Sequence, residues 1–233
     1  MLEKGLFRGV LTMAVMAIST NARTARADVI LPDLPAGSQY QLAFVTTDTT
    51  NGTSDAESYY NGFVTAEAAP LTAMLPGSAT WSAMTSTFNG GNLVDASNNA
   101  ITYSGMPIYN TQGDLVAIGG SGPQGLWTGS IENPIYFDQI GSPVGQSRFV
   151  WTGILGVGFE TNGLGDPGTP FANMGWAQYA NAYWFYAGDT FQSDMLSVYA
   201  LSSPITVPVP EPSTLTLLGL ALLGLGVVYR KRE

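Results

Sequence analysis

The chain has 233 residues, with 17 acidic side chains, 8 basic ones, no histidine and no cysteine. These counts exclude a catalytic histidine, a cysteine nucleophile, a zinc site built from cysteine and histidine, and any disulfide framework. Only 11% of the residues are charged, against roughly 25% in an average soluble domain, and the length fits one domain of ordinary size or at most two small ones.

The first 27 residues have the three-part pattern of a secretory signal peptide. A basic start with Lys4 and Arg8 precedes the apolar run 9–18, and the segment closes on Ala25-Arg26-Ala27. The apolar run would span only about 15 Å as a helix, which is too short for a bilayer core of roughly 30 Å. We therefore expect cleavage after Ala27, with Asp28 as the first mature residue.

Basic residues are nearly absent between the two ends of the chain. Residues 28–209 hold one basic side chain, Arg148, against 14 acidic ones, which gives a formal net charge of −13. Such a surface repels phosphate backbones, so nucleic-acid binding is not expected, whereas cations and neutral hydroxylated partners are tolerated. The acidic balance is typical of a protein that stays soluble in an external medium.

One clear helix is predicted in the central segment. Tyr40–Thr47 is rich in aromatic and β-branched residues and predicts a strand before it. Ser54–Ala69 predicts the helix, because Ser54 and Glu57 have the spacing of a capping box and apolar residues follow at steps of three and four. Pro70 is expected to end this helix.

The remainder of the central segment predicts short strands and glycine-rich loops. Five further strands are expected, at Thr80–Ser86, Met106–Asn110, Leu115–Ile118, Phe149–Gly153 and Met195–Leu201. The second and third of these are expected to pair as a hairpin. Gly119–Gly125 has no lysine and no helix pattern after it, so it is not a phosphate-binding loop. Gly156–Gly175 predicts a long surface loop.

The last 26 residues combine three features in a fixed order. Pro208, Pro210 and Pro212 make a stiff extended stretch, the uncharged apolar segment 213–229 follows, and Arg230-Lys231-Arg232 come next. As a helix the apolar segment would span about 26 Å, enough for a thin bilayer, so a C-terminal transmembrane helix is expected. The positive-inside rule keeps the basic cluster in the cytoplasm and places the bulk of the chain outside.

The tail resembles the PEP-CTERM sorting signal of Gram-negative bacteria. The resemblance rests on Pro210, Glu211 and Pro212, on the leucine- and glycine-rich segment, and on Arg230, Lys231 and Arg232 after it. It implies recognition by exosortase, a membrane-embedded cysteine protease or transpeptidase, with Glu211 in the recognition site. The same tail has also been labelled an ice-binding protein C-terminal region, a label that is no evidence of ice binding. A simple tail anchor is the alternative.

Residues 28–207 carry a second set of landmarks. These are Phe44-Val45-Thr46, the helix after it, Thr80–Ala83, Leu126–Ile135 and Val150–Gly153, with Ser197–Ala200 at the end. Their order resembles a family of secreted bacterial domains of unknown function with a C-type-lectin-like or endostatin-like fold. The resemblance implies an α+β, C-type-lectin-like domain with short strands and one clear helix. The cysteines frequent in that family are absent, so the fold must rely on its aromatic core. An all-β sandwich is the alternative, which the helix at 54–69 disfavours.

No cofactor is required by the sequence, but one loop is a candidate for calcium. Glu160, Asn162 and Asp166 place oxygen-bearing side chains on a glycine-rich loop, and calcium prefers such ligands. Their spacing matches no EF-hand, and a flexible polar loop is the alternative.

An aromatic-rich stretch is the candidate for sugar contact. Trp176, Tyr183 and Trp184 could stack on a sugar ring, whereas such clusters more often fill a core.

These observations predict an exported, non-enzymatic protein with exosortase and the inner membrane as partners. Before processing, the C-terminal helix would anchor it in the inner membrane with its core outside the cytoplasm. Afterwards it would lie at the cell surface or be extracellular, with a structural or adhesive role in a matrix and weak binding of extracellular polysaccharide. The alternative is a secreted glycosidase, because paired carboxylates are the main catalytic arrangement that this composition leaves. A spacer with no ligand is a third reading.

Overall fold

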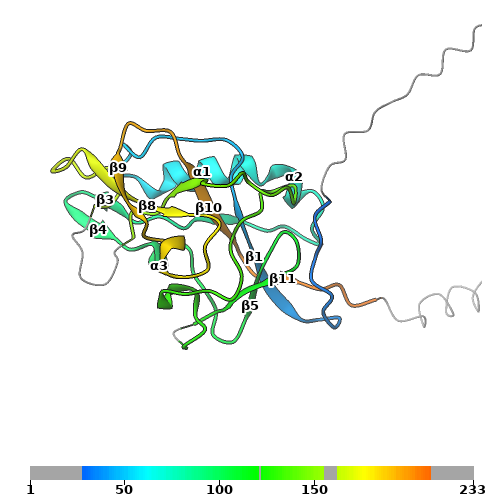
Figure 1. Cartoon of the computed structure of the whole chain (residues 1–233). Coiled ribbons are helices and arrows are strands. Elements are labelled where there is room, and N and C mark those ends of the chain that lie inside the picture. Colours follow the sequence, from blue (N-terminus) through cyan, green and yellow to red (C-terminus); the bar gives the residue numbers. More distant parts are fainter. Residues whose placement is uncertain (1–27, 121, 155–161, 211–233) are drawn as a thin grey trace, which may run out of the picture.

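The computed structural model describes residues 28–120, 122–154 and 162–210, which are mostly strand with few helices (Figure 1). The strands are β1 (Gln39–Val45), β2 (Trp81–Ala83), β3 (Thr87–Asn89), β4 (Asn92–Val94), β5 (Pro107–Asn110), β6 (Leu115–Ile118), β7 (Phe149–Trp151), β8 (Phe171–Trp176), β9 (Gly188–Phe191), β10 (Ser197–Ser202) and β11 (Ile205–Thr206). The helices are α1 (Glu57–Glu67), α2 (Ala69–Thr72) and α3 (Ala96–Asn99), with 3₁₀ turns η1 (Leu126–Thr128) and η2 (Ala182–Trp184).

The main sheet has the strand order β6-β5-β1-β10-β7-β8-β9. Strand β11 pairs with β1, and β2 pairs with β10, outside this path. The β1–β5 and β10–β7 pairs are parallel and the other pairs are antiparallel. Strands β3 and β4 form a separate hairpin. The first strand and the last long strand therefore lie side by side in the centre of the sheet.

Both faces of the central strands are buried. On β1, Leu42 and Phe44 belong to the core cluster that contains Tyr60 and Val64 of α1, whereas Val45 belongs to the cluster on the other side. That second cluster is filled from the segment after β6, by residues such as Leu126, Ile131 and Ile135, and by the indole of Trp184 from η2. Strands covered on both faces read as continuous apolar runs, which explains the strong strand signal of this segment.

Helix α1 starts later than its sequence pattern predicts. It begins at Glu57, and its N-cap residue Ala56 makes no side-chain capping bond. The predicted capping box is wrong, because the Oγ of Ser54 accepts a hydrogen bond from the amide of Ala56 at 3.2 Å, ahead of the helix. Pro70 does stop α1, but it also occupies the first turn of α2, where a missing amide hydrogen is tolerated.

The predicted strands are confirmed, with the bounds of β6 unchanged and those of the others shorter or shifted by one or two residues, and the expected hairpin is the β5–β6 pair. The prediction of a surface loop at 156–175 is wrong over β8, whose residues Ala172, Asn173 and Gly175 are buried. A sheet together with the helix α1 agrees with the predicted α+β class at a coarse level. Because strands dominate and helices are few, the structure also fits the alternative of an all-β sandwich. No helix among the described residues could span a membrane, and the predicted helix 213–229 lies outside them.

Candidate functional site

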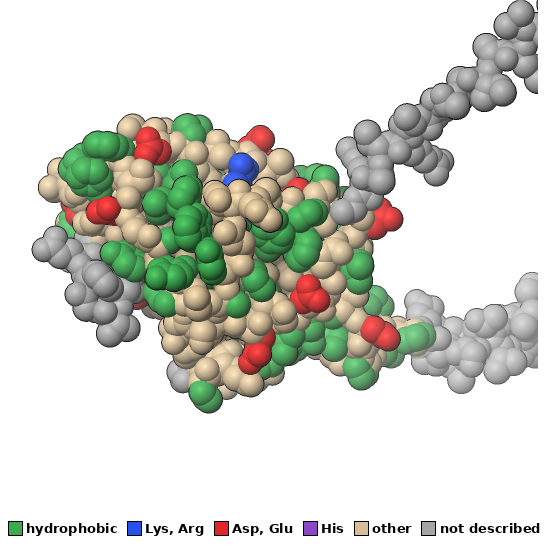
Figure 2. Space-filling view, viewed as in Figure 1, with side chains coloured by type: hydrophobic (Ala, Val, Ile, Leu, Met, Phe, Trp, Pro, Cys, Tyr) green, Lys and Arg blue, Asp and Glu red, His purple; other side chains and the backbone are tan. Residues whose placement is uncertain are grey.

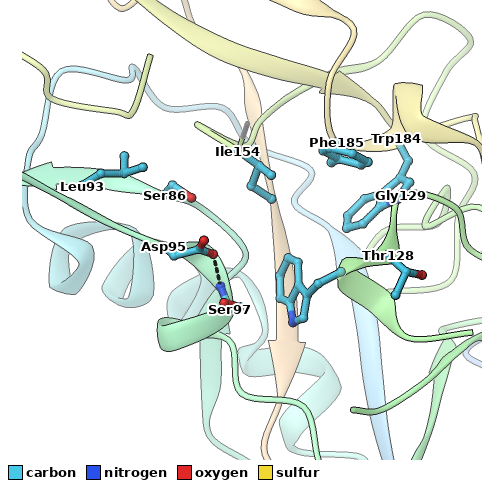
Figure 3. A pocket seen from close by; sticks show the side chains of 10 residues that line it. Ser86, Leu93, Asp95, Ser97, Thr128, Gly129, Ile154, Trp184 and Phe185 are labelled. Atoms are coloured by element: carbon cyan, nitrogen blue, oxygen red, sulfur yellow. Dashed lines mark hydrogen bonds between the residues drawn. The ribbon is translucent and has the colours of Figure 1, made fainter. Parts of the chain in front are cut away.

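A cavity of about 220 Å³ opens between the β3–β4 hairpin and the two 3₁₀ turns. It is lined by Ser86, Leu93, Asp95, Ser97, Trp127, Thr128, Gly129, Ile154, Trp184 and Phe185. Figure 3 shows Leu93, Ser86, Asp95 and Ser97 along one wall, Thr128, Gly129, Trp184 and Phe185 along the other, and Ile154 between them. One wall is therefore mainly polar and the other is largely aromatic.

Backbone contacts hold the polar wall in place. The amide of Ser86 donates to the carbonyl of Thr152 at 2.7 Å, and the Ser86 Oγ accepts from the amide of Ala96 at 2.9 Å. Asp95 is the N-cap of α3, with its Oδ1 accepting from the amide of Ser97 at 2.9 Å. Acidic N-caps stabilise helix starts, so this carboxylate has a structural use as well as a place in the cavity wall.

The aromatic wall is built from two tryptophans whose ring centroids lie 6.2 Å apart, Trp127 of η1 and Trp184 of η2. Trp184 also packs edge-on against Phe185 and Tyr199, at 5.4 and 5.7 Å. The Nε1 atoms of both tryptophans are buried and have no hydrogen-bond partner among the described residues. A buried donor without a partner costs about 1–3 kcal/mol, so this wall is not a fully satisfied piece of core.

The aromatic residues predicted to contact sugar do not form one exposed surface. Trp184 is only 1% exposed, because its indole is packed into the core beneath the cavity, and its contact with sugar stays a prediction. Trp176 is half-buried and stacks on Phe149 and Tyr179 at 5.3 and 5.2 Å. Tyr183 is 53% exposed. Trp127, which sequence reasoning placed in a structural segment, is the tryptophan that faces the cavity beside Trp184.

The predicted calcium ligands are only partly described. Glu160 lies outside the described residues. The Oδ1 of Asp166 accepts a hydrogen bond from the backbone amide of Gly168 at 2.7 Å. The side-chain Nδ2 of Asn162 donates to the Oδ2 of Asp189 at 3.5 Å. Within the described ranges no group of three or more acidic residues is placed to hold a metal ion. Calcium binding by this loop therefore stays a prediction.

The sorting residues lie at the edge of what the structure describes. Pro210 is the last described residue, and Glu211, Pro212, Arg230, Lys231 and Arg232 lie beyond it. Ala25 and Ala27 of the signal-peptide prediction precede the described part, whereas the carbonyl of Asp28 accepts from the Nε2 of Gln112 at 3.0 Å. The predicted first mature residue is thus held against the β5–β6 turn.

Comparison with known proteins finds one similarity. A model of the PEP-CTERM protein-sorting motif matches residues 208–232. No curated protein and no solved structure matches the chain, so the C-type-lectin-like resemblance of the central segment has no support from these comparisons. The chain therefore carries a PEP-CTERM sorting motif at residues 208–232, which implies an extracellular protein that is exported and processed by exosortase at the membrane.

Proposed function

We propose that this chain is an exported surface protein whose domain at 28–207 has a non-enzymatic, structural or adhesive role outside the cell. The observation that carries the export and surface location in this proposal is the PEP-CTERM motif, which begins directly after the strand that completes the fold. Strand β11 ends at Thr206, and the motif begins at Pro208. The sorting signal is therefore joined to the folded domain without a long linker.

The residue that follows β11, the last strand, is hydrogen-bonded to the residues that precede β1, the first strand. The amide of Gly37 donates to the carbonyl of Val207, and the amide of Val207 donates to the carbonyl of Ser38, both at 2.9 Å. Figure 1 shows that the chain leaves the domain from this side at both ends, while the β3–β4 hairpin lies at the opposite end. An apolar helix at 213–229 would hold the domain at the inner membrane by this side until exosortase acts. The β3–β4 hairpin, which carries the cavity residue Leu93, would then lie on the side of the domain away from the membrane.

Two further parts of the proposal concern the cavity. Weak glycan binding is supported by the aromatic wall of Trp127 and Trp184, which offers an apolar face beside hydroxyl groups. A C-type-lectin-like fold is supported only by the order of the sequence landmarks. A non-enzymatic role is supported by the cavity lining, in which Asp95 is the single carboxylate among the residues that the structure describes. Glycoside hydrolysis of the usual kind needs a pair of carboxylates that flank the bond to be cut.

The test compares the full chain in host cells with and without exosortase. We expect a shortened form at the surface or in the medium when the enzyme is present, and an uncut inner-membrane form when it is absent. Glu211→Ala should prevent processing, whereas Glu233→Ala, an acidic residue outside the matched motif, should leave it unchanged. Equal processing of both variants, or surface release without exosortase, would overturn the sorting role. Hydrolysis of polysaccharide by the released domain would overturn the non-enzymatic role in favour of a glycosidase.

A further inference from the structure

Three hollows follow one another along one surface of the domain. The first is the cavity of about 220 Å³ described above, and the second, of about 410 Å³, shares Ser97, Trp127 and Thr128 with it. The third, of about 170 Å³, shares Ile101 with the second. Ligand sites for drug-sized molecules occupy about 300–1,000 Å³, so the first and third hollows are each too small and the second is large enough on its own. We call this row of three neighbouring hollows the Trp127 groove.

The groove is almost uncharged although the domain is strongly acidic. Asp95 is the one charged residue among the described residues that line the three hollows. The other lining residues include hydroxyl, amide and apolar side chains. Figure 2 shows acidic side chains scattered over the face that it displays. An anionic polymer would be repelled by the net charge, and a cationic polymer would find no row of carboxylates in the groove.

Apolar side chains stand at the junctions between the hollows. Trp127 is half-buried and separates the first hollow from the second, and Ile101, which is 55% exposed, separates the second from the third. Tyr103, 42% exposed, lines the third. The negatively polarised face of an aromatic ring attracts the C–H face of a hexose ring. Together these side chains offer apolar contacts to successive rings of a chain.

The hydroxyl groups between them are of two kinds. Those of Thr102, Ser202 and Ser203 accept hydrogen bonds from backbone amides at 2.8–3.3 Å, so their positions are fixed. The hydroxyls of Ser82 and Ser97 make no hydrogen bond within the described part of the chain. The hydroxyls of Thr102 and Ser203 are half-buried and keep a lone pair free to accept from a ligand, whereas Ser202 is only 2% exposed. The hydroxyls of Ser82 and Ser97 can both donate and accept. Sugar hydroxyls need this mixture of donors and acceptors.

We propose that the Trp127 groove binds a linear, neutral polysaccharide chain that runs past Trp127 and Ile101, with one or more sugar rings in each hollow. This proposal names a ligand class for the adhesive role proposed above. It rests on that proposed function only in requiring that the domain lies outside the cell. It differs from simple sugar binding because affinity must grow with chain length as the second and third hollows are filled.

The test uses the full chain, purified in a detergent without a sugar head group. Its ligands are three neutral hexasaccharides (cellohexaose, maltohexaose and β-1,4-mannohexaose), their monosaccharides, and hexagalacturonic acid as an anionic control. Binding is followed by tryptophan fluorescence and by isothermal titration. We expect at least one neutral hexasaccharide to bind about tenfold or more tightly than its monosaccharide, and hexagalacturonic acid not to bind.

Variants locate the binding on the groove. Trp127→Ala should abolish hexasaccharide binding, and Trp176→Ala, a matched half-buried tryptophan outside the groove, should leave it unchanged. Ile101→Asp changes an exposed side chain and should not disturb folding. It should weaken hexasaccharide binding about tenfold or more while monosaccharide binding is kept, because only the longer ligand crosses Ile101. Failure of all three hexasaccharides, equal affinity for monosaccharide and hexasaccharide, or unchanged binding by Ile101→Asp would overturn the proposal. None of these results affects exosortase processing, which the localisation experiment measures separately.

Discussion

The phenol of Tyr199 donates a hydrogen bond to the carbonyl oxygen of Trp184 at 3.0 Å, and both residues are buried. This bond joins the central strand β10 to the η2 turn that carries the aromatic wall of the groove. Tyr199→Phe should lower the free energy of unfolding by about 1 kcal/mol, because the carbonyl of Trp184 then lacks a partner. Urea unfolding of the purified protein measures this loss. Tyr103→Phe, at an exposed tyrosine, serves as the control, and an equal loss there would contradict the assignment.

Buried tyrosines make the domain sensitive to alkali. Burial raises the pKa of Tyr199 well above its ordinary value, and burial is also the largest cause of the raised pKa of Tyr60. The folded protein keeps these protons above pH 10, where the unfolded chain releases them, so stability is unaffected below about pH 10 and falls above it. The slope approaches about 1.4 kcal/mol per pH unit for each protected tyrosine.

Unfolding by urea at several values between about pH 8 and pH 11 measures this dependence. Tyr199→Phe should make the alkaline slope shallower, and Tyr183→Phe, at an exposed position, should leave it as it is. A free energy of unfolding that stays constant up to pH 11 would show that the buried phenols ionise in the folded state.

Replacing glycine by alanine should destabilise the protein at Gly175 and stabilise it at Gly62. A Cβ on Gly175 in β8 would lie 2.0 Å from the carbonyl oxygen of Trp184, so Gly175→Ala should push η2 off the sheet. We expect a loss of about 3 kcal/mol or failure to fold. Gly62 in α1 has open space at its Cβ position, so Gly62→Ala should stabilise the protein by about 0.5–1 kcal/mol through helix propensity. Thermal unfolding distinguishes the two, and similar shifts for both would contradict the packing of η2 on β8.

The hydrogen bond between Val207 and Ser38 predicts that proline at Val207 and proline at Val209 have different effects on stability. Val207→Pro removes the amide that donates to Ser38 and should cost about 1 kcal/mol of stability. Val209 is 67% exposed, and its amide makes no hydrogen bond within the described residues, so Val209→Pro should be neutral. Urea unfolding of the full chain in detergent compares the two variants. Equal stability of both would mean that the pairing with Ser38 contributes little.

Local sequence signals predicted some elements well and others poorly. Strands β1 and β10 are predictable because they lie in the centre of the sheet and are buried on both faces. Such strands are rich in apolar residues along their whole length. Strand β8 was missed because Gly175 reads as a loop residue, although the structure needs a glycine there for close approach to Trp184. The start of α1 was misplaced because the Ser54 hydroxyl bonds locally to Ala56 before the helix begins.

The groove could not be predicted from the sequence. Its aromatic wall joins Trp127 and Trp184, which are far apart in the chain and have no shared spacing or motif. Trp184 lies in an aromatic stretch that predicts sugar contact, whereas Trp127 lies in the landmark segment Leu126–Ile135, which carries no signal of a binding site. The sorting motif is the opposite case: its residues are contiguous, so sequence alone identified it and the family model matches it.

The central position of β10 has a consequence for export. Its residues pair with β1, β2 and β7, and the amide of Val198 also bonds to the hydroxyl of Thr46 across 152 positions of sequence. A chain that crosses the membrane from its N-terminus delivers β1 early and β10 almost last. The sheet therefore cannot close until nearly the whole domain has crossed, and such long-range pairing is intrinsically slow. Holding the chain at the membrane by its tail would give this late closure time to finish before release.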